Sequence, residues 1–120
     1  MKYESTITVQ AKSAHGVTLR LNRMSFARRM ELMQRIRDLG ARTDRAGGTD
    51  EILQNMDATL LAFEVDRTYV LWGVREITGL EVDGIPATPQ SLAEAGPEAL
   101  FREALTAVKG ICGLAGAKGA

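Results

Sequence analysis

The spacing of hydrophobic and polar positions divides the chain into a short N-terminal part with strand periodicity and a longer part with helical periodicity. Residues 3–10 are rich in β-branched side chains and alternate in part, and residues 17–22 alternate more strictly. Both ranges are therefore expected to be strands. The polar segment 11–16 that joins them makes an antiparallel hairpin the simplest pairing.

A first helix is predicted after Ser25, whose hydroxyl can accept from a free amide of the first turn. Mainly apolar side chains then recur at three- and four-residue spacing up to Leu39, and this stripe is expected to face the core. Its members are Phe26, Met30, Met33, Ile36 or Arg37, and Leu39. Gly40 is expected to close the helix. The Gly-rich range 40–49 is then a loop, and its glycine spacing fits neither a P-loop nor a dinucleotide fingerprint.

A second helix is predicted from Thr49 or Asp50 to Trp72, with Gly73 ending it. About 23 residues correspond to roughly 34 Å of helix, which is long for so small a domain. Such a helix should either form the spine of the fold or project a face that the domain alone cannot cover. Residues 74–78 either continue it briefly or turn into a strand.

The segment from Leu80 to Ala87 is expected to form two short strands joined at Asp83-Gly84, because Asp-Gly favours a turn with positive φ at both central residues. Pro86 lacks an N–H donor, so this arm must be short or lie at an edge. The sequence therefore predicts a second, smaller hairpin.

The C-terminal third is predicted to hold two helices. Thr88-Pro89 combines an N-cap with proline at the first helical position and begins the helix 89–95. Gly96-Pro97 breaks it, and an amphipathic helix follows as far as Ile111. The fold class is thus α+β: an N-terminal β-hairpin, two main helices, a short Asp-Gly hairpin and C-terminal helices. We expect a single domain over residues 1–112 and a flexible Gly/Ala-rich tail over 113–120.

Composition fits one ordinary domain, since the chain has 120 residues of which 45% are hydrophobic. Fifteen basic and fifteen acidic residues cancel, which removes the general argument for a nucleic-acid or membrane partner. The charge is nevertheless divided. Residues 1–48 hold ten basic and four acidic side chains, and residues 49–120 hold five and eleven. The halves can neutralise each other within one fold or between copies, or the basic face can dock an acidic partner.

No catalytic, cofactor or metal site is expected from the residue types present. His15 is the single histidine and lies in the predicted hairpin turn, and Cys112 is the single cysteine, which excludes an intramolecular disulfide. A core position suits Cys112, and no carboxylate pair has the spacing of an acid and base in a cleft. We therefore expect a protein that is not an enzyme. One cysteine and the lack of a long apolar run favour the cytoplasm.

The central stretch resembles a known family. Trp72-Gly73, the range 79–89, Leu92 and the range 96–100 resemble a pattern in small phage and prophage tail proteins, notably tail assembly chaperones. The resemblance covers roughly residues 60–113. It implies a non-enzymatic protein of the bacterial host cytoplasm that binds the tape measure protein and tail tube subunits during tail assembly, with a homo-oligomer possible.

The family offers no catalytic residues, so only protein-contact candidates are named. They are Trp72, Phe63 and Tyr69 on the long helix and Arg28, Arg29 and Arg35 on the basic one. Two other functions remain open. One is a structural virion subunit, such as a tail completion or connector protein. The other is a nucleic-acid-binding regulator that would use the basic helix, against which stands the zero net charge.

Overall fold

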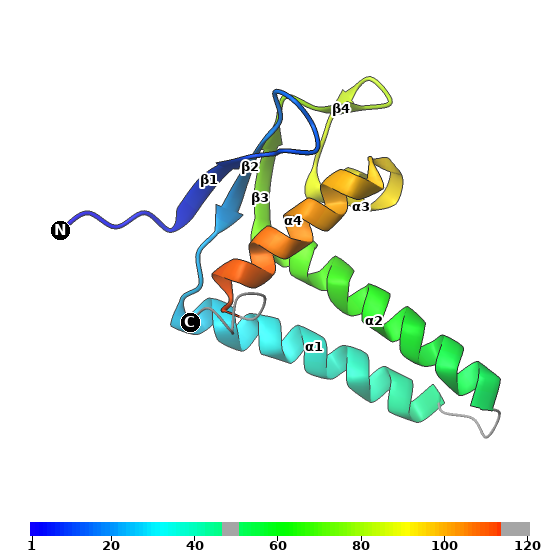
Figure 1. Cartoon of the computed structure of the whole chain (residues 1–120). Coiled ribbons are helices and arrows are strands. Elements are labelled where there is room, and N and C mark those ends of the chain that lie inside the picture. The colour runs from blue at the N-terminus through cyan, green and yellow to red at the C-terminus, as the bar shows by residue number, and fades with distance from the viewer. Residues whose placement is uncertain (47–50, 114–120) are drawn as a thin grey trace. The chain divides into compact units, whose positions relative to one another are not determined.

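The computed structural model describes residues 1–46 and 51–113 and confirms the predicted α+β class (Figure 1). Its elements in chain order are β1 (Thr6–Gln10), β2 (Thr18–Asn22), α1 (Phe26–Ala46), α2 (Glu51–Gly73), β3 (Val74–Thr78), β4 (Glu81–Val82), β5 (Ile85–Pro86), α3 (Pro89–Ala95) and α4 (Glu98–Ile111). All but the first residue of the predicted tail 113–120 lie outside the described residues.

Contacts along the chain define two compact units. Unit 1 combines residues 1–24 with residues 69–120, and unit 2 comprises residues 25–68. Unit 1 therefore holds all five strands, α3, α4 and the last turn of α2. Unit 2 holds α1 and the rest of α2.

Unit 1 is built on a three-stranded antiparallel sheet in the order β1-β2-β3. The predicted N-terminal hairpin is confirmed by pairs such as Val9 with Leu19. Residues 74–78, for which helix and strand both remained open, form the third strand. A bulge interrupts the β2–β3 register, because Arg20 pairs with Glu76 whereas Leu21 pairs with Val74. The extra residue, Arg75, lets β3 bury both Val74 and Ile77 despite their odd spacing.

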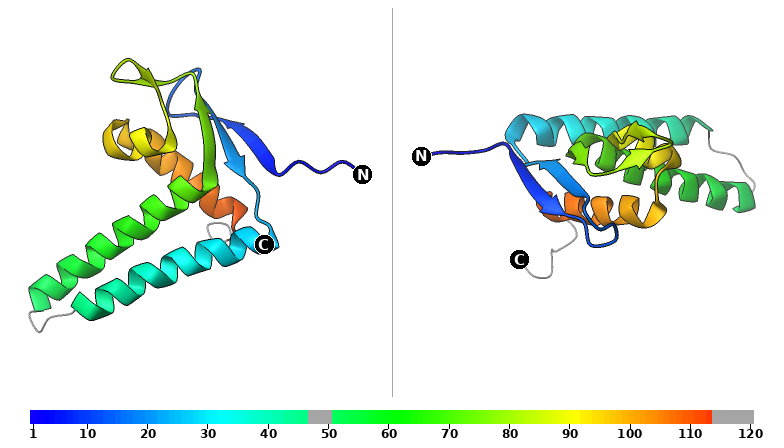
Figure 2. Two further views of the ribbon diagram at one scale, coloured as in Figure 1. Left: turned by 180° about the vertical axis from the view of Figure 1, so that it is seen from behind. Right: turned by 90° about the horizontal axis from the view of Figure 1, so that it is seen from above.

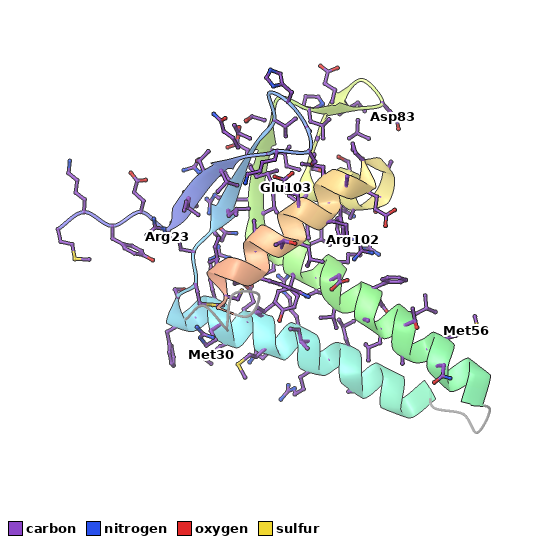
Figure 3. The ribbon with its side chains drawn as sticks, in the orientation of Figure 1. Arg23, Met30, Met56, Asp83, Arg102 and Glu103 are labelled. Carbon is purple, nitrogen blue, oxygen red and sulfur yellow. The ribbon has the colours of Figure 1, made fainter. Side chains whose placement is uncertain are left out.

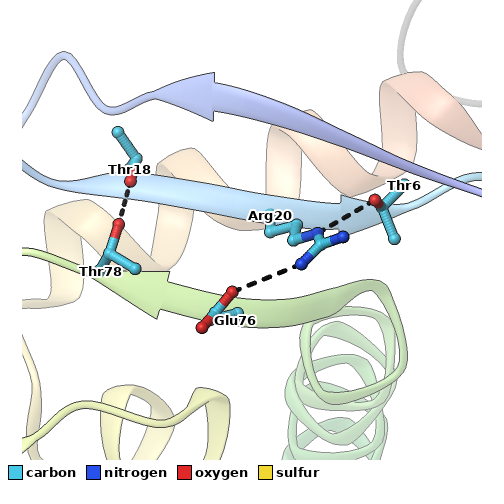
Figure 4. Close-up of polar contacts among 5 residues, drawn as sticks. All are labelled: Thr6, Thr18, Arg20, Glu76 and Thr78. Carbon is cyan, nitrogen blue, oxygen red and sulfur yellow. Dashed lines mark hydrogen bonds and ion pairs between the residues drawn. The ribbon is translucent and has the colours of Figure 1, made fainter. Parts of the chain in front are cut away.

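The core of unit 1 lies on one face of this sheet. Leu19 and Leu21 of β2 are fully buried, as are Leu92 of α3 and Leu100 and Val108 of α4. Helix α4 lies on the side of the sheet opposite the polar side chains drawn in Figure 4. A strand with one buried face alternates in this way because successive side chains point to opposite sides.

Local signals in the C-terminal third are confirmed. Asp83 and Gly84 have φ values of 55° and 80°, as the predicted Asp-Gly turn requires. The Thr88 hydroxyl accepts from the Ser91 backbone N–H at 3.0 Å, and the Ser91 hydroxyl accepts from the Thr88 N–H at 2.9 Å. This reciprocal capping box begins α3, with Pro89 at the first helical position.

The predicted end of the first helix at Gly40 is wrong. Ser25 caps α1 as expected, since its Oγ accepts from the Arg28 N–H at 3.2 Å, but α1 continues to Ala46. A helical glycine costs only about 1 kcal/mol relative to alanine, and good helix formers such as Ala41 follow it. The expected loop 40–49 is therefore helical up to residue 46, and residues 47–49 lie outside the described residues.

Unit 2 is a pair of helices. Helix α1 and residues 51–68 of α2 run side by side in opposite directions in every view (Figure 2). Gly73 ends α2 as predicted.

Candidate interaction surface

Helix α1 carries a row of exposed apolar side chains, which we call the α1 stripe. Phe26 is 82% exposed, Met30 49% and Met33 63%. Their spacing of four and then three residues places them on one face of the helix. The expectation that these three residues face the core is therefore wrong.

The same spacing recurs on α2, where Met56, Leu60 and Phe63 form what we call the α2 stripe. These side chains are 56%, 56% and 51% exposed. A shallow surface hollow lies over this helix, lined by Asn55, Met56, Thr59 and Leu60. Large apolar side chains in rows of this kind are typical of surfaces that bind another protein.

Each helix also has a second, less exposed apolar face. On α1 this face includes Leu32, which is buried, and the half-buried Ile36. On α2 it includes the half-buried Leu61 and Val65. Because apolar positions occupy two faces of α1, spacing alone could not decide which face the fold would cover. A helix that is apolar on most sides is typical of an element buried all round.

The two stripes face away from each other. In Figure 3 the side chain of Met30 points away from α2, and that of Met56 points away from α1. The helix pair of unit 2 is therefore apolar on two opposite outer sides. No single flat partner surface could cover both stripes at once.

Among the aromatic contact candidates, Phe63 is exposed, whereas Tyr69 and Trp72 belong to the core of unit 1. Tyr69 is 7% exposed and Trp72 is 3% exposed. The Lys109 ammonium lies 5.6 Å from the centroid of the Tyr69 ring, and Asn22 donates to the Trp72 carbonyl at 3.0 Å. These contacts hold the end of α2 against α4 and β2. In this conformation only Phe63 of the three presents its ring to a partner.

The basic contact candidates lie on α1. Arg29 and Arg35 are exposed and Arg28 is half-buried. Arg35 forms an ion pair with Glu31 at 3.4 Å, and an exposed pair of this kind contributes only about 0.3–0.5 kcal/mol. Arg29 lies beside the α1 stripe, three residues after Phe26, so a partner on that stripe would meet its charge.

A second exposed surface is the polar face of the sheet (Figure 4). Arg20 lies 3.7 Å from Glu76, and its Nε donates to the Thr6 hydroxyl at 3.1 Å. The hydroxyls of Thr18 and Thr78 are also hydrogen-bonded to each other. These polar groups satisfy one another across the three strands, so the face is explained as the solvated side of the sheet.

One carboxylate ties the β1–β2 connection to α4. Glu103 accepts from the backbone N–H of Lys12 at 2.6 Å, from the N–H of Ser13 at 2.9 Å and from the Ser13 hydroxyl at 2.7 Å. The Ser13 hydroxyl, followed by the two backbone donors, holds the pKa of Glu103 below its ordinary value of 4.5. Hydrogen bonds to the charged form have this effect because they favour ionisation.

Glu103→Gln is expected to lower the free energy of unfolding at pH 7 by about 1 kcal/mol. The expected loss is this small because water screens the charge of a carboxylate near the surface. Because the folded pKa is depressed, the stabilisation is present above pH 4.5 and is lost as the pH falls through the lower folded value. The difference from wild type should therefore shrink in acid. Urea unfolding of both proteins between pH 7 and pH 3 measures this difference in the free energy of unfolding.

Glu98→Gln provides a matched control on the same helix. Glu98 is exposed in the first turn of α4 and forms an ion pair with Arg102 at 3.6 Å. Its replacement should change stability by less than about 0.5 kcal/mol. Equal losses in the two variants would contradict a specific role for Glu103.

The single histidine and the single cysteine of the chain both belong to unit 1. His15 is exposed in the β1–β2 connection, and Cys112 is buried at the end of α4, as expected for a core thiol. Among residues 1–46 and 51–113, no group of three or more histidine, cysteine or acidic side chains could hold a metal ion. No helix in this part of the chain is long and apolar enough to span a bilayer.

The comparisons with known proteins add no family: no family model, no curated protein and no solved structure matches the chain.

Proposed function

We propose that the chain is a non-enzymatic phage tail assembly protein, a chaperone that binds the tape measure protein and tail tube subunits in the host cytoplasm. The observation that carries the proposal is the pair of exposed apolar stripes on unit 2. The resemblance of the segment from Trp72 to Leu100 to tail assembly chaperones supplies the biological setting.

The stripes suit a helical client. An amphipathic helix binds a groove or helix face through apolar side chains at spacings of three, four and seven residues. The α1 and α2 stripes have this spacing, and the unbranched side chains of Met30, Met33 and Met56 adapt readily to different partners. A long helical protein such as a tape measure protein presents many such segments.

Co-expression with the tape measure and tube proteins encoded beside this gene tests the proposal. We expect the chain to bring soluble tape measure protein through affinity purification and to be absent from finished tails. A stoichiometric amount in purified particles would instead support a structural subunit, such as a tail completion or connector protein. Failure to recover either protein would contradict the chaperone function.

Phe63→Glu is expected to reduce the recovered tape measure protein at least about tenfold, because a carboxylate would be buried against the client. Ala62→Glu is the matched control, since residue 62 is exposed on another face of α2. Quantitative pull-down of both variants measures the effect. Equal recovery with the two variants would exclude the α2 stripe as the client site.

A further inference from the structure

We propose that, in the absence of a client, the chain assembles head to tail by packing the α1 stripe of one copy on the α2 stripe of the next. This inference does not rest on the chaperone function, because it concerns contacts between identical chains. It follows from the spacing, the charge and the direction of the two stripes.

The spacing of both stripes matches a coiled-coil seam. Positions 26, 30 and 33 and positions 56, 60 and 63 each follow a four-then-three pattern, which is the d-a-d part of a heptad. Each row spans roughly 11 Å along its helix, from its first residue to its last, so the two seams have the same length and can interlock. Each is left exposed within its own copy.

Charge selects which stripes meet. Within its bounds α1 has six arginines and three acidic residues, whereas α2 has one arginine and four acidic residues. Close to the seams, Arg29 lies beside the α1 stripe, and Asp57, Glu64 and Asp66 flank the α2 stripe on helical spacing. A contact between two copies of α1, or between two copies of α2, would place like charges together. A contact between α1 and α2 places opposite charges together.

The directions in which the two stripes point then decide the kind of assembly. Because the stripes point to opposite sides of the helix pair (Figure 3), one neighbour cannot cover both. Each copy would use its α1 stripe with one neighbour and its α2 stripe with another. Such a heterologous contact repeats until it closes into a ring or continues as a filament. A client helix would compete with a neighbouring copy for the same side chains.

Two variants, each with one damaged stripe, test the proposal on the purified full chain. Met33→Glu damages only the α1 stripe, and Leu60→Glu damages only the α2 stripe. Both side chains are more than half exposed, so each variant is expected to fold, which far-UV circular dichroism checks. Sedimentation velocity should show wild-type oligomers larger than dimers and at least about 30-fold weaker self-association in either variant.

Mixing the variants is the decisive step. The intact α2 stripe of Met33→Glu can bind the intact α1 stripe of Leu60→Glu, and the damaged stripes prevent any further addition. The mixture should therefore form a one-to-one dimer. Ala58→Glu, at an exposed position of α2 outside its stripe, is a charge-matched control that should retain wild-type assembly.

The other outcomes overturn the proposal. A monomeric wild type at high concentration would show that copies do not cover the stripes. Oligomers formed by either variant alone would indicate contact between like stripes or through another surface. Two monomeric variants that do not combine would exclude contact between α1 and α2. None of these outcomes depends on the tape measure protein, so the chaperone function is tested separately.

Discussion

Gly79→Ala is expected to lower the free energy of unfolding of unit 1 by about 4 kcal/mol, the largest loss that we foresee for a single methyl group. Gly79 has φ +86°, and a Cβ there would lie 2.1 Å from the Gly16 carbonyl oxygen and 3.3 Å from the Val17 Cα. Both atoms belong to the backbone, so they cannot move aside by a rotamer change as a side chain does. The connection before β2 and the end of β3 would have to separate.

Gly84→Ala is the matched control for this substitution. Gly84 has φ +80°, nearly the same conformation, but a Cβ there has nothing within 4 Å. Its replacement should cost only the left-handed backbone strain, about 1–2 kcal/mol. Urea unfolding of both variants separates strain from collision. Similar losses would show that the close approach of Gly79 to Gly16 contributes little.

Gly73→Ala is expected to lower the free energy of unfolding by about 2 kcal/mol although alanine is the better helix former. A Cβ at residue 73 would lie 2.5 Å from Val108 Cγ1 and 2.6 Å from Cγ2. Val108 is 1% exposed in the core, so it has little room to move. The last turn of α2 would therefore be pushed away from α4.

A double-mutant cycle identifies the cause. Val108→Ala alone should cost about 2 kcal/mol by leaving a cavity. The Gly73→Ala/Val108→Ala double variant should be about as stable as Val108→Ala, because the new methyl group then occupies the vacated space. The expected coupling is about 2 kcal/mol, measured from urea unfolding of the four proteins. Additive losses would show that Gly73 matters for a reason other than its contact with Val108.

Features governed by neighbouring residues were predictable from the sequence. The Asp83-Gly84 turn, the Thr88 cap and the Ser25 cap each depend on the chemistry of a few consecutive residues, and all three are confirmed. The end of α1 was not predictable in this way. The cost of a single helical glycine is small, so Gly40 could not stop a helix that its neighbours favour.

Features governed by distant residues required the tertiary structure. Residues 74–78 form a strand because they pair with the edge of β2, about 55 residues earlier in the chain. The bulge at Arg75 is also a property of the pairing between β2 and β3. The carboxylate of Glu103 likewise meets Lys12 and Ser13 only because α4 packs beside the β1–β2 connection.

For the candidate interaction surface, the sequence supplied the residues and the tertiary structure supplied their exposure. Apolar periodicity placed Phe26, Met30 and Met33 on a helix but assigned them to the core, because the pattern records which residues share a face and not what covers it. The long second helix was expected either to form the spine or to project an uncovered face. Its last turn joins the core of unit 1, whereas Met56, Leu60 and Phe63 remain exposed.

The sequence by itself thus determined the elements, their caps and turns, since these depend on local interactions. Only the tertiary structure decided which apolar faces are buried, since burial depends on the elements that pack against each face.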